Sequence, residues 1–214
     1  MTKESKKRGR GRPPGTKKPE SKYLSQKQWI AFQDVIKKNP MADFLFNLMM
    51  IATARVGEIT NLKLEDIRLD ERPPKVLVRG LKGGYTNSYP LSASLMQKYR
   101  RWMRKREKLA VAETSDFLFI TKLTEPGRGI SRDNVQLLFK LYAKRAGLSE
   151  NFSCHSLRHF GAIQLAKANF SVSSIQAHLR QKSPNSALEY IEFVGRDREI
   201  AIQENMGVLN GLVR

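Results

Sequence analysis

The segment from Met41 to Ala52 constrains the fold most, because apolar side chains occupy almost every position in it. A helix that is apolar on all sides has no face to offer to water, so it belongs in the middle of a packed core. Other elements must surround such a helix. A chain of 214 residues that is 40% hydrophobic can do this within one main domain.

Charged residues follow this core helix at once, in the segment Thr53-Ala54-Arg55-Val56-Gly57-Glu58-Ile59. An arginine and a glutamate at the end of a buried helix need water, a partner or a ligand. Arg55 and Glu58 either pair with each other at a helix–loop junction or serve a functional site. These residues alone leave both alternatives open.

A second polar pair occurs in Cys154-His155-Ser156-Leu157-Arg158-His159-Phe160, which is typical of the start of a helix. His155 and Arg158 are three residues apart and therefore share one helix face. Arginine suits bidentate contact with a phosphate, and histidine suits proton transfer near neutral pH. The pair thus fits a site that holds a phosphate and acts on it, whereas an isolated His-x-x-Arg is commonly an ordinary surface helix.

Apolar residues at helical spacing along most of the chain predict a mainly α-helical fold. One exception is the alternating segment Lys75–Arg79, which predicts a strand; a turn at 80–84 and a second strand at 86–91 follow it. Lys82 then lies at the tip or shoulder of a β-hairpin, where a lysine is normally just solvated. We expect an α+β fold, mainly a helical bundle, with a small antiparallel sheet or hairpin.

Two more helices are expected near the C-terminus. The first bears His178, Arg180 and Gln181. Ser183-Pro184 then opens a short helix with Leu188 and Ile191 inward and Tyr190 beside them. The remaining segment, 196–214, is mildly amphipathic and is expected to pack on its own domain or on a neighbouring subunit.

Net charge is the strongest global signal, since 39 Lys and Arg against 20 Asp and Glu give +19. Such an excess predicts a polyanionic partner, most simply nucleic acid. Residues 1–22 hold +7 of it and almost no large apolar residue, so we expect a disordered basic tail before a folded domain over 23–214.

Within the tail, Arg10-Gly11-Arg12-Pro13 resembles the core of an AT-hook, which lies in the narrow minor groove of A·T-rich DNA. The alternative is a generic basic tail or a localisation signal. The candidate DNA-binding residues of the tail are Arg8, Arg10, Arg12, Lys17 and Lys18.

The single cysteine, Cys154, excludes an internal disulfide framework and a cysteine-rich metal site. The sequence has no apolar run long enough to cross a bilayer, and its N-terminus lacks the apolar stretch of a signal peptide. We therefore expect an intracellular, DNA-associated protein that does not contact membranes.

Taken together, these segments resemble the catalytic domain of the tyrosine recombinase family, also called the phage integrase family, over about residues 23–195. The elements that carry the likeness are Arg55 with Glu58, Lys82 in a Lys-Gly-Gly hairpin, the box His155–His159, and Tyr190. The His-x-Leu-Arg-His box and the Arg-x-x-Glu segment are its most specific parts.

The resemblance implies a role for each residue. Arg55 and Arg158 would clamp the scissile phosphate, and Lys82 would protonate the leaving 5′ oxygen. His155 would assist proton transfer at the nucleophile, Tyr190, whose attack gives a 3′-phosphotyrosyl link. Two guanidinium groups can neutralise the charge of a phosphodiester transition state without a metal, so no metal or other cofactor is expected.

Glu58 and His159 are expected to support this site. One residue departs from the family pattern: Gln181 stands where the family usually has a second His or a Trp. Glutamine can donate a hydrogen bond to a phosphate oxygen, but it cannot act as an acid or base. His178, one helical turn earlier, is a candidate substitute.

A second departure is that only the basic tail precedes the catalytic domain, so the tail is expected to take over part of DNA retention. The resemblance further implies double-stranded DNA as substrate, a homotetramer on DNA, accessory DNA-binding proteins, and a mobile element or virus as the source. Two other functions stay open: a non-catalytic DNA-binding protein on a recombinase fold, and a topoisomerase-like enzyme that relaxes DNA.

Overall fold

The computed structural model describes residues 23–81 and 84–210, with side chains described through Ile200. Its α-helices are α1 (Gln26–Ile36), α2 (Pro40–Ile51), α3 (Val56–Thr60), α4 (Ala93–Arg106), α5 (Arg132–Arg145), α6 (Cys154–Lys167), α7 (Val172–His178) and α8 (Asn185–Asn210). Two 3-10 helices are η1 (Leu64–Asp66) and η2 (Ala110–Glu113). The strands β1 (Ile67–Arg68), β2 (Lys75–Val78) and β3 (Asn87–Pro90) form one antiparallel sheet in that order. The predicted mainly helical fold with a small antiparallel sheet is confirmed.

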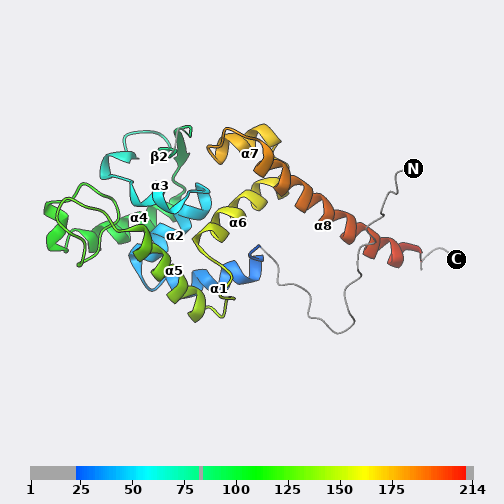
Figure 1. Ribbon diagram of the computed structural model, residues 1–214, viewed down its shortest axis with the longest axis horizontal. Coiled ribbons are helices and arrows are strands. Elements are labelled where there is room, and N and C mark those ends of the chain that lie inside the picture. Colours follow the sequence, from blue (N-terminus) through cyan, green and yellow to red (C-terminus); the bar gives the residue numbers. More distant parts are fainter. Residues whose placement is uncertain (1–22, 82–83, 211–214) are drawn as a thin grey trace, which may run out of the picture.

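Helix α2 lies in the core, as its composition requires, and packs against α1, α4 and α6 (Figure 1). Asn39 is the N-cap of this helix. Its side chain accepts hydrogen bonds from the backbone amides of Met41 and Ala42, at 3.0 and 3.2 Å. Pro40 takes the first helical position, where a missing N–H costs nothing. The start of the core helix is thus fixed by its cap, and the turn after its C-terminal end leads to Arg55.

A second, smaller apolar cluster joins α6, α7 and α8. Ala187, Tyr190 and Val194 form the inner face of α8, whereas Leu188, expected inward, is 42% exposed. Ile191 packs against the cluster as expected but is only partly buried, so the buried stripe of α8 is formed by Ala187, Tyr190 and Val194.

The prediction of a short helix around Tyr190 is wrong in its length. α8 continues without a break from Asn185 to Asn210 and projects away from the rest of the domain (Figure 1). The expected start of a separate C-terminal segment at residue 196 therefore lies inside a helix. No helix in the described part of the chain has the length and hydropathy needed to cross a membrane.

Candidate active site

Arg55 is held at the start of α3 by a capping interaction with Glu58. The Arg55 backbone amide donates to Glu58 Oε2 at 2.9 Å, and the Arg55 guanidinium donates to Oε1 at 3.0 Å. The Glu58 side chain is fully buried, whereas that of Arg55 is 37% exposed. The ion pair considered as one alternative is therefore present, yet it leaves Arg55 facing a cavity.

Glu58 also pairs with a second arginine, Arg180, whose Nη2 lies 2.8 Å from Oε2. Burial by itself would raise the pKa of Glu58, but the Arg180 charge, the Arg55 amide and the Arg158 charge outweigh it and lower this pKa. Glu58 is consequently ionised and holds the guanidinium groups of Arg55 and Arg180 in place.

Arg158 extends from α6 and is 1% exposed. Its guanidinium donates to the backbone carbonyls of Thr53 and Leu179, the latter at 2.9 Å. Burial, with the nearby charge of Arg55, lowers the pKa of Arg158 to about 10, so it remains a cation at neutral pH. Arg158 thus joins two segments: the turn that precedes Arg55 and the C-terminal end of α7.

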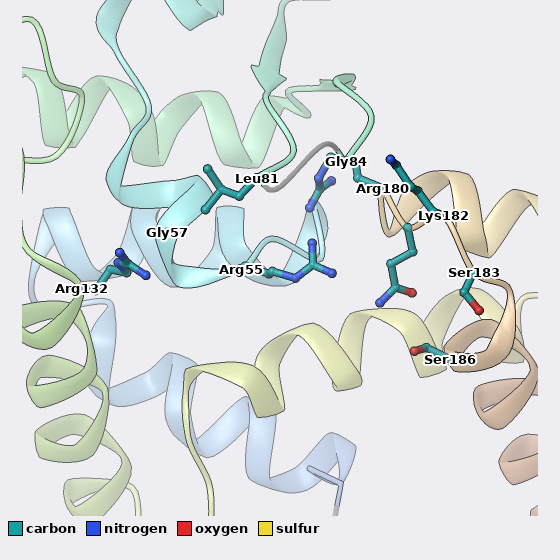
Figure 2. Close-up of a pocket in the computed structure, with 10 residues that line it drawn as sticks. Arg55, Gly57, Leu81, Gly84, Arg132, Arg180, Lys182, Ser183 and Ser186 are labelled. Carbon is teal, nitrogen blue, oxygen red and sulfur yellow. The ribbon is translucent and has the colours of Figure 1, made fainter.

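A cavity of about 510 Å³ lies in front of Arg55 and Arg180, whereas Arg158 is buried behind it and is not among the residues that line it. The described residues that line it are Arg55, Gly57, Leu81, Gly84, Arg132, Arg180, Gln181, Lys182, Ser183 and Ser186. Four of them are cations and none is acidic, which suits a phosphate group. Figure 2 shows Arg55 and Arg132 entering this region from separate elements.

Tyr190 does not line this cavity. It is 3% exposed, and its hydroxyl lies 2.6 Å from His159 Nδ1. Burial raises the pKa of Tyr190 to about 12, and the charge of Arg158 offsets part of that effect. The phenol therefore keeps its proton at neutral pH and faces an imidazole that can receive it.

His155 and His159 lie one turn apart on α6, and their ring centroids are 4.4 Å apart. His155 is exposed, whereas His159 contacts Tyr190 directly. The histidine that contacts the tyrosine is thus His159, which was expected only to support the site, and not His155, which was expected to assist proton transfer. His178 donates from Nε2 to the Ile51 carbonyl at 2.9 Å and does not line the cavity.

Gln181 lines the cavity, just beyond the end of α7 rather than on the helix where it was expected. Six candidate residues lie outside the described residues: Lys82, Arg8, Arg10, Arg12, Lys17 and Lys18. Leu81 and Gly84, which flank residues 82–83 in sequence, both line the cavity.

Two residues of the site were missed in the sequence. Arg132 follows the Ser131 cap and so begins α5, and a cation at the first turn of a capped helix was a usable signal. Arg180 follows the last turn of α7 with a backbone φ of 55°. No pattern in the sequence indicates that its side chain turns inward.

Comparison with known proteins agrees with this fold. Residues 22–193 match the Phage integrase family. The chain belongs to this family.

Tyrosine recombinase XerA of Pyrococcus furiosus is 27% identical over 193 residues, covering 90% of this chain and 64% of that protein. Tyrosine recombinase XerD of Ralstonia nicotianae is 32% identical over 155 residues, covering 72% of this chain and 48% of that protein. The type 1 fimbriae regulatory protein FimE of Escherichia coli is 25% identical over 79% of this chain and 84% of its own length. The chain thus spans less than two thirds of the length of the two recombinases.

Solved structures share the fold. A crystal structure of XerA recombinase superposes with a TM-score of 0.70 at 19% identity, over 84% of this chain and 62% of that one. XerH recombinase bound to palindromic difH substrate gives 0.70 at 23% identity, over 84% and 52%. A lambda integrase tetramer bound to a Holliday junction gives 0.57 at 20% identity, over 78% and 47%.

Proposed function

We propose that this protein is a site-specific recombinase that cleaves and rejoins DNA strands through Tyr190. The observation that carries the proposal is the contact between the Tyr190 hydroxyl and His159. The charge of Arg158 acts on Tyr190, and Arg158 holds the turn that brings Arg55 to a cavity whose described lining contains four cations and no acid. Membership of the Phage integrase family supports it. The two relatives named tyrosine recombinases perform the activity that their names state.

In the proposed reaction, the Tyr190 oxygen forms a bond to phosphorus as the bond from phosphorus to the 5′ oxygen breaks. The tyrosine proton passes to His159, with His155 next to it, and Lys82 gives a proton to the leaving 5′ oxygen. Arg55 and Arg158 neutralise the phosphoryl oxygens. Stabilisation of the transition state by these preorganised positive charges is the largest expected contribution to the rate. The link to tyrosine conserves the phosphodiester energy, so rejoining requires no ATP.

Covalent capture tests the proposal. End-labelled nicked duplexes and four-way junctions, taken from DNA around the protein's own gene, are mixed with the protein and then denatured. We expect a labelled protein band from which digestion releases phosphotyrosine. Tight DNA binding with no band on any of these substrates would favour the non-catalytic alternative.

The pH dependence of cleavage follows from the raised pKa of Tyr190, about 12. A phenol that is protonated at neutral pH must lose its proton during attack, so alkaline conditions help. We expect the single-turnover rate to rise between about pH 7 and about pH 9, with DNA affinity nearly constant. A level rate across this range would indicate that the proton passes to His159 during attack without prior ionisation of the phenol, and a falling rate would contradict loss of the tyrosine proton.

Arg132 is proposed to contact a DNA phosphate beside the scissile one. It is exposed, lines two adjoining cavities, and makes no ion pair within the described part of the chain. Replacing it with alanine should weaken DNA binding by about 3- to 10-fold at low salt and reduce the salt slope by about 1. Arg145→Ala, at the far end of α5, is the matched control, and equal losses in the two variants would refute a specific phosphate contact.

Assembly is proposed to involve residues 196–214, of which 196–210 continue α8 away from the domain. Four copies acting on two duplexes would use these segments to dock on neighbouring subunits. A chain ending at residue 195 should stay folded and bind DNA but assemble poorly on four-way junctions, as measured by analytical ultracentrifugation. Unchanged tetramers would contradict this role.

The basic tail is proposed to retain the protein on DNA, with Arg10-Gly11-Arg12 in an A·T-rich minor groove. Chains lacking residues 1–22 should lose affinity for A·T-rich more than for G·C-rich duplexes if the motif acts as a hook. Equal losses would favour a generic basic tail. Accessory proteins, a mobile genetic source and a DNA-associated location inside the cell remain predictions.

A further inference from the structure

Arg180 occupies a backbone position that favours glycine. α7 ends in a Schellman motif, in which the Arg180 amide donates to the Ala177 carbonyl at 2.9 Å and the Gln181 amide donates to the Gln176 carbonyl at 3.2 Å. Arg180 is the left-handed residue of this motif, with a φ of 55°. A side chain is disfavoured there relative to glycine, so retaining arginine at this place indicates a task for its guanidinium.

The guanidinium of Arg180 is buried, with 1% of the residue exposed, and it joins three elements of the site. Its Nη atoms donate to the carbonyls of Ala52, Thr53 and His178, at 2.9, 3.2 and 3.1 Å, to the hydroxyl of Tyr89, and to Glu58 Oε2 at 2.8 Å. It thus connects the turn before Arg55, strand β3 and the end of α7.

Charge balance shows why this connection matters. Glu58 is buried and receives three donors, two from Arg55 and one from Arg180. Without Arg180, the Glu58 carboxylate would cancel the charge of Arg55 and draw its guanidinium inward, away from the cavity. With Arg180, the three residues carry a net charge of +1, which remains available to an anion.

We propose that Arg180 is a positioning residue of the cleavage site, acting through Glu58 to hold Arg55 against the scissile phosphate. The inference rests on the proposed function for the identity of that phosphate. Gln181, the next residue, lines the cavity without a charge. Arg180 supplies a cation to this corner of the cavity from the protein interior.

The test compares Arg180→Gly and Arg180→Lys with the parent protein by two measurements. The first is the affinity for inorganic phosphate, from NMR titration of the Arg55 side-chain Nε–H signal. The second is the single-turnover rate of covalent capture on nicked DNA. Glycine suits the left-handed position, but Arg180→Gly also removes a donor from the buried Glu58 carboxylate, so both measurements are made at a temperature where urea unfolding shows the variant to be folded. The folded variant should bind phosphate at least 10-fold more weakly and cleave at least 100-fold more slowly. Arg180→Lys should recover part of both losses.

Two further variants isolate the mechanism. Asn169→Gly is the matched control, because Asn169 is exposed and has a φ of 62°, so glycine enters the same backbone conformation outside the site. It should leave both measurements unchanged. In a Glu58→Gln background, Arg180→Gly should change phosphate affinity less than 3-fold, because the charge that Arg180 neutralises is gone.

The outcomes separate the two proposals. Phosphate affinity that is unmeasurable in the parent, equal in Arg180→Gly, or reduced equally with and without Glu58 would overturn the role of Arg180. The expected phosphate results without any covalent DNA product would support that role and overturn the recombinase activity. The expected phosphate results with equal cleavage by parent and Arg180→Gly would overturn the role of Arg180 in cleavage.

Discussion

Replacing Tyr190 with phenylalanine is expected to abolish the covalent protein–DNA product while leaving the fold intact. The ring fills a cluster with Ala187 and Val194, and phenylalanine fills the same volume. The change removes the hydrogen bond to His159, which costs about 1 kcal/mol of unfolding free energy. Loss of a nucleophile that works with a base typically lowers the rate by more than about 10⁴-fold. Denaturing gels of labelled nicked DNA measure the product, and urea unfolding measures the stability.

Tyr142→Phe is the matched control for this variant. Tyr142 is also a nearly buried tyrosine, 6% exposed, but it packs in the main core against Phe46. It should retain the full yield of covalent product. A product that persists in Tyr190→Phe would place the nucleophile elsewhere, and Tyr23, whose ring centroid lies 6.4 Å from that of Tyr190, would be examined first.

The same variant separates the alternative functions. A non-catalytic DNA-binding protein would show no product in the parent and no difference on changing Tyr190. A relaxing enzyme would lose superhelical turns from a plasmid in a Tyr190-dependent way without exchanging strands between duplexes. Recombination requires both the covalent product and exchanged strands.

Replacing Arg158 with methionine is expected to reduce both stability and cleavage. The side chain is buried, and its guanidinium satisfies the carbonyls of Thr53 and Leu179. Methionine leaves the Leu179 carbonyl without this donor and the Thr53 carbonyl with Arg180 alone, which should lower the unfolding free energy by about 1–3 kcal/mol. Loss of one cation that stabilises the phosphoryl transition state should slow cleavage by about 10²- to 10³-fold. Urea unfolding and single-turnover capture, at a temperature where the variant is folded, measure the two effects.

Arg106→Met separates the effect on stability from the effect on chemistry. Arg106 is also buried, 3% exposed, and donates to the carbonyls of Ser115 and Phe117. Its replacement should cost comparable stability, yet the folded variant should cleave at the parent rate. If Arg106→Met and Arg158→Met slow cleavage equally, Arg158 acts only through the fold.

Local patterns in the sequence predicted the core helix, the helix that begins with the His155 box and the β2–β3 hairpin, and offered the Arg55–Glu58 ion pair as one alternative. Each depends on residues close in sequence, where apolar spacing and caps determine the backbone. The sequence did not reveal that His159, rather than His155, contacts Tyr190. The two histidines are four residues apart on one helix face, so only the packing of α8 against α6 distinguishes them.

The length of α8 and the contacts of Arg180 could likewise not be predicted from local sequence patterns. Gly195 lowers helix propensity by about 1 kcal/mol, which favours a boundary close to residue 196. The helix nevertheless continues through it to Asn210. Arg180 forms its contacts across 122 to 128 residues of intervening sequence with Glu58, Thr53 and Ala52, which no periodicity encodes.

The Thr53 carbonyl accepts from both Arg158 and Arg180, which lie 105 and 127 residues further along the chain. Closing such long loops costs entropy before any contact repays it, so these bonds form late in folding. A nascent chain on the ribosome therefore presents Arg55 long before either partner is synthesised, and the helix with Tyr190 is synthesised after both. The network that joins Arg55, Arg158 and Arg180 therefore cannot form until the chain has been made through α7, and the proposed cleavage site further requires the helix that carries Tyr190.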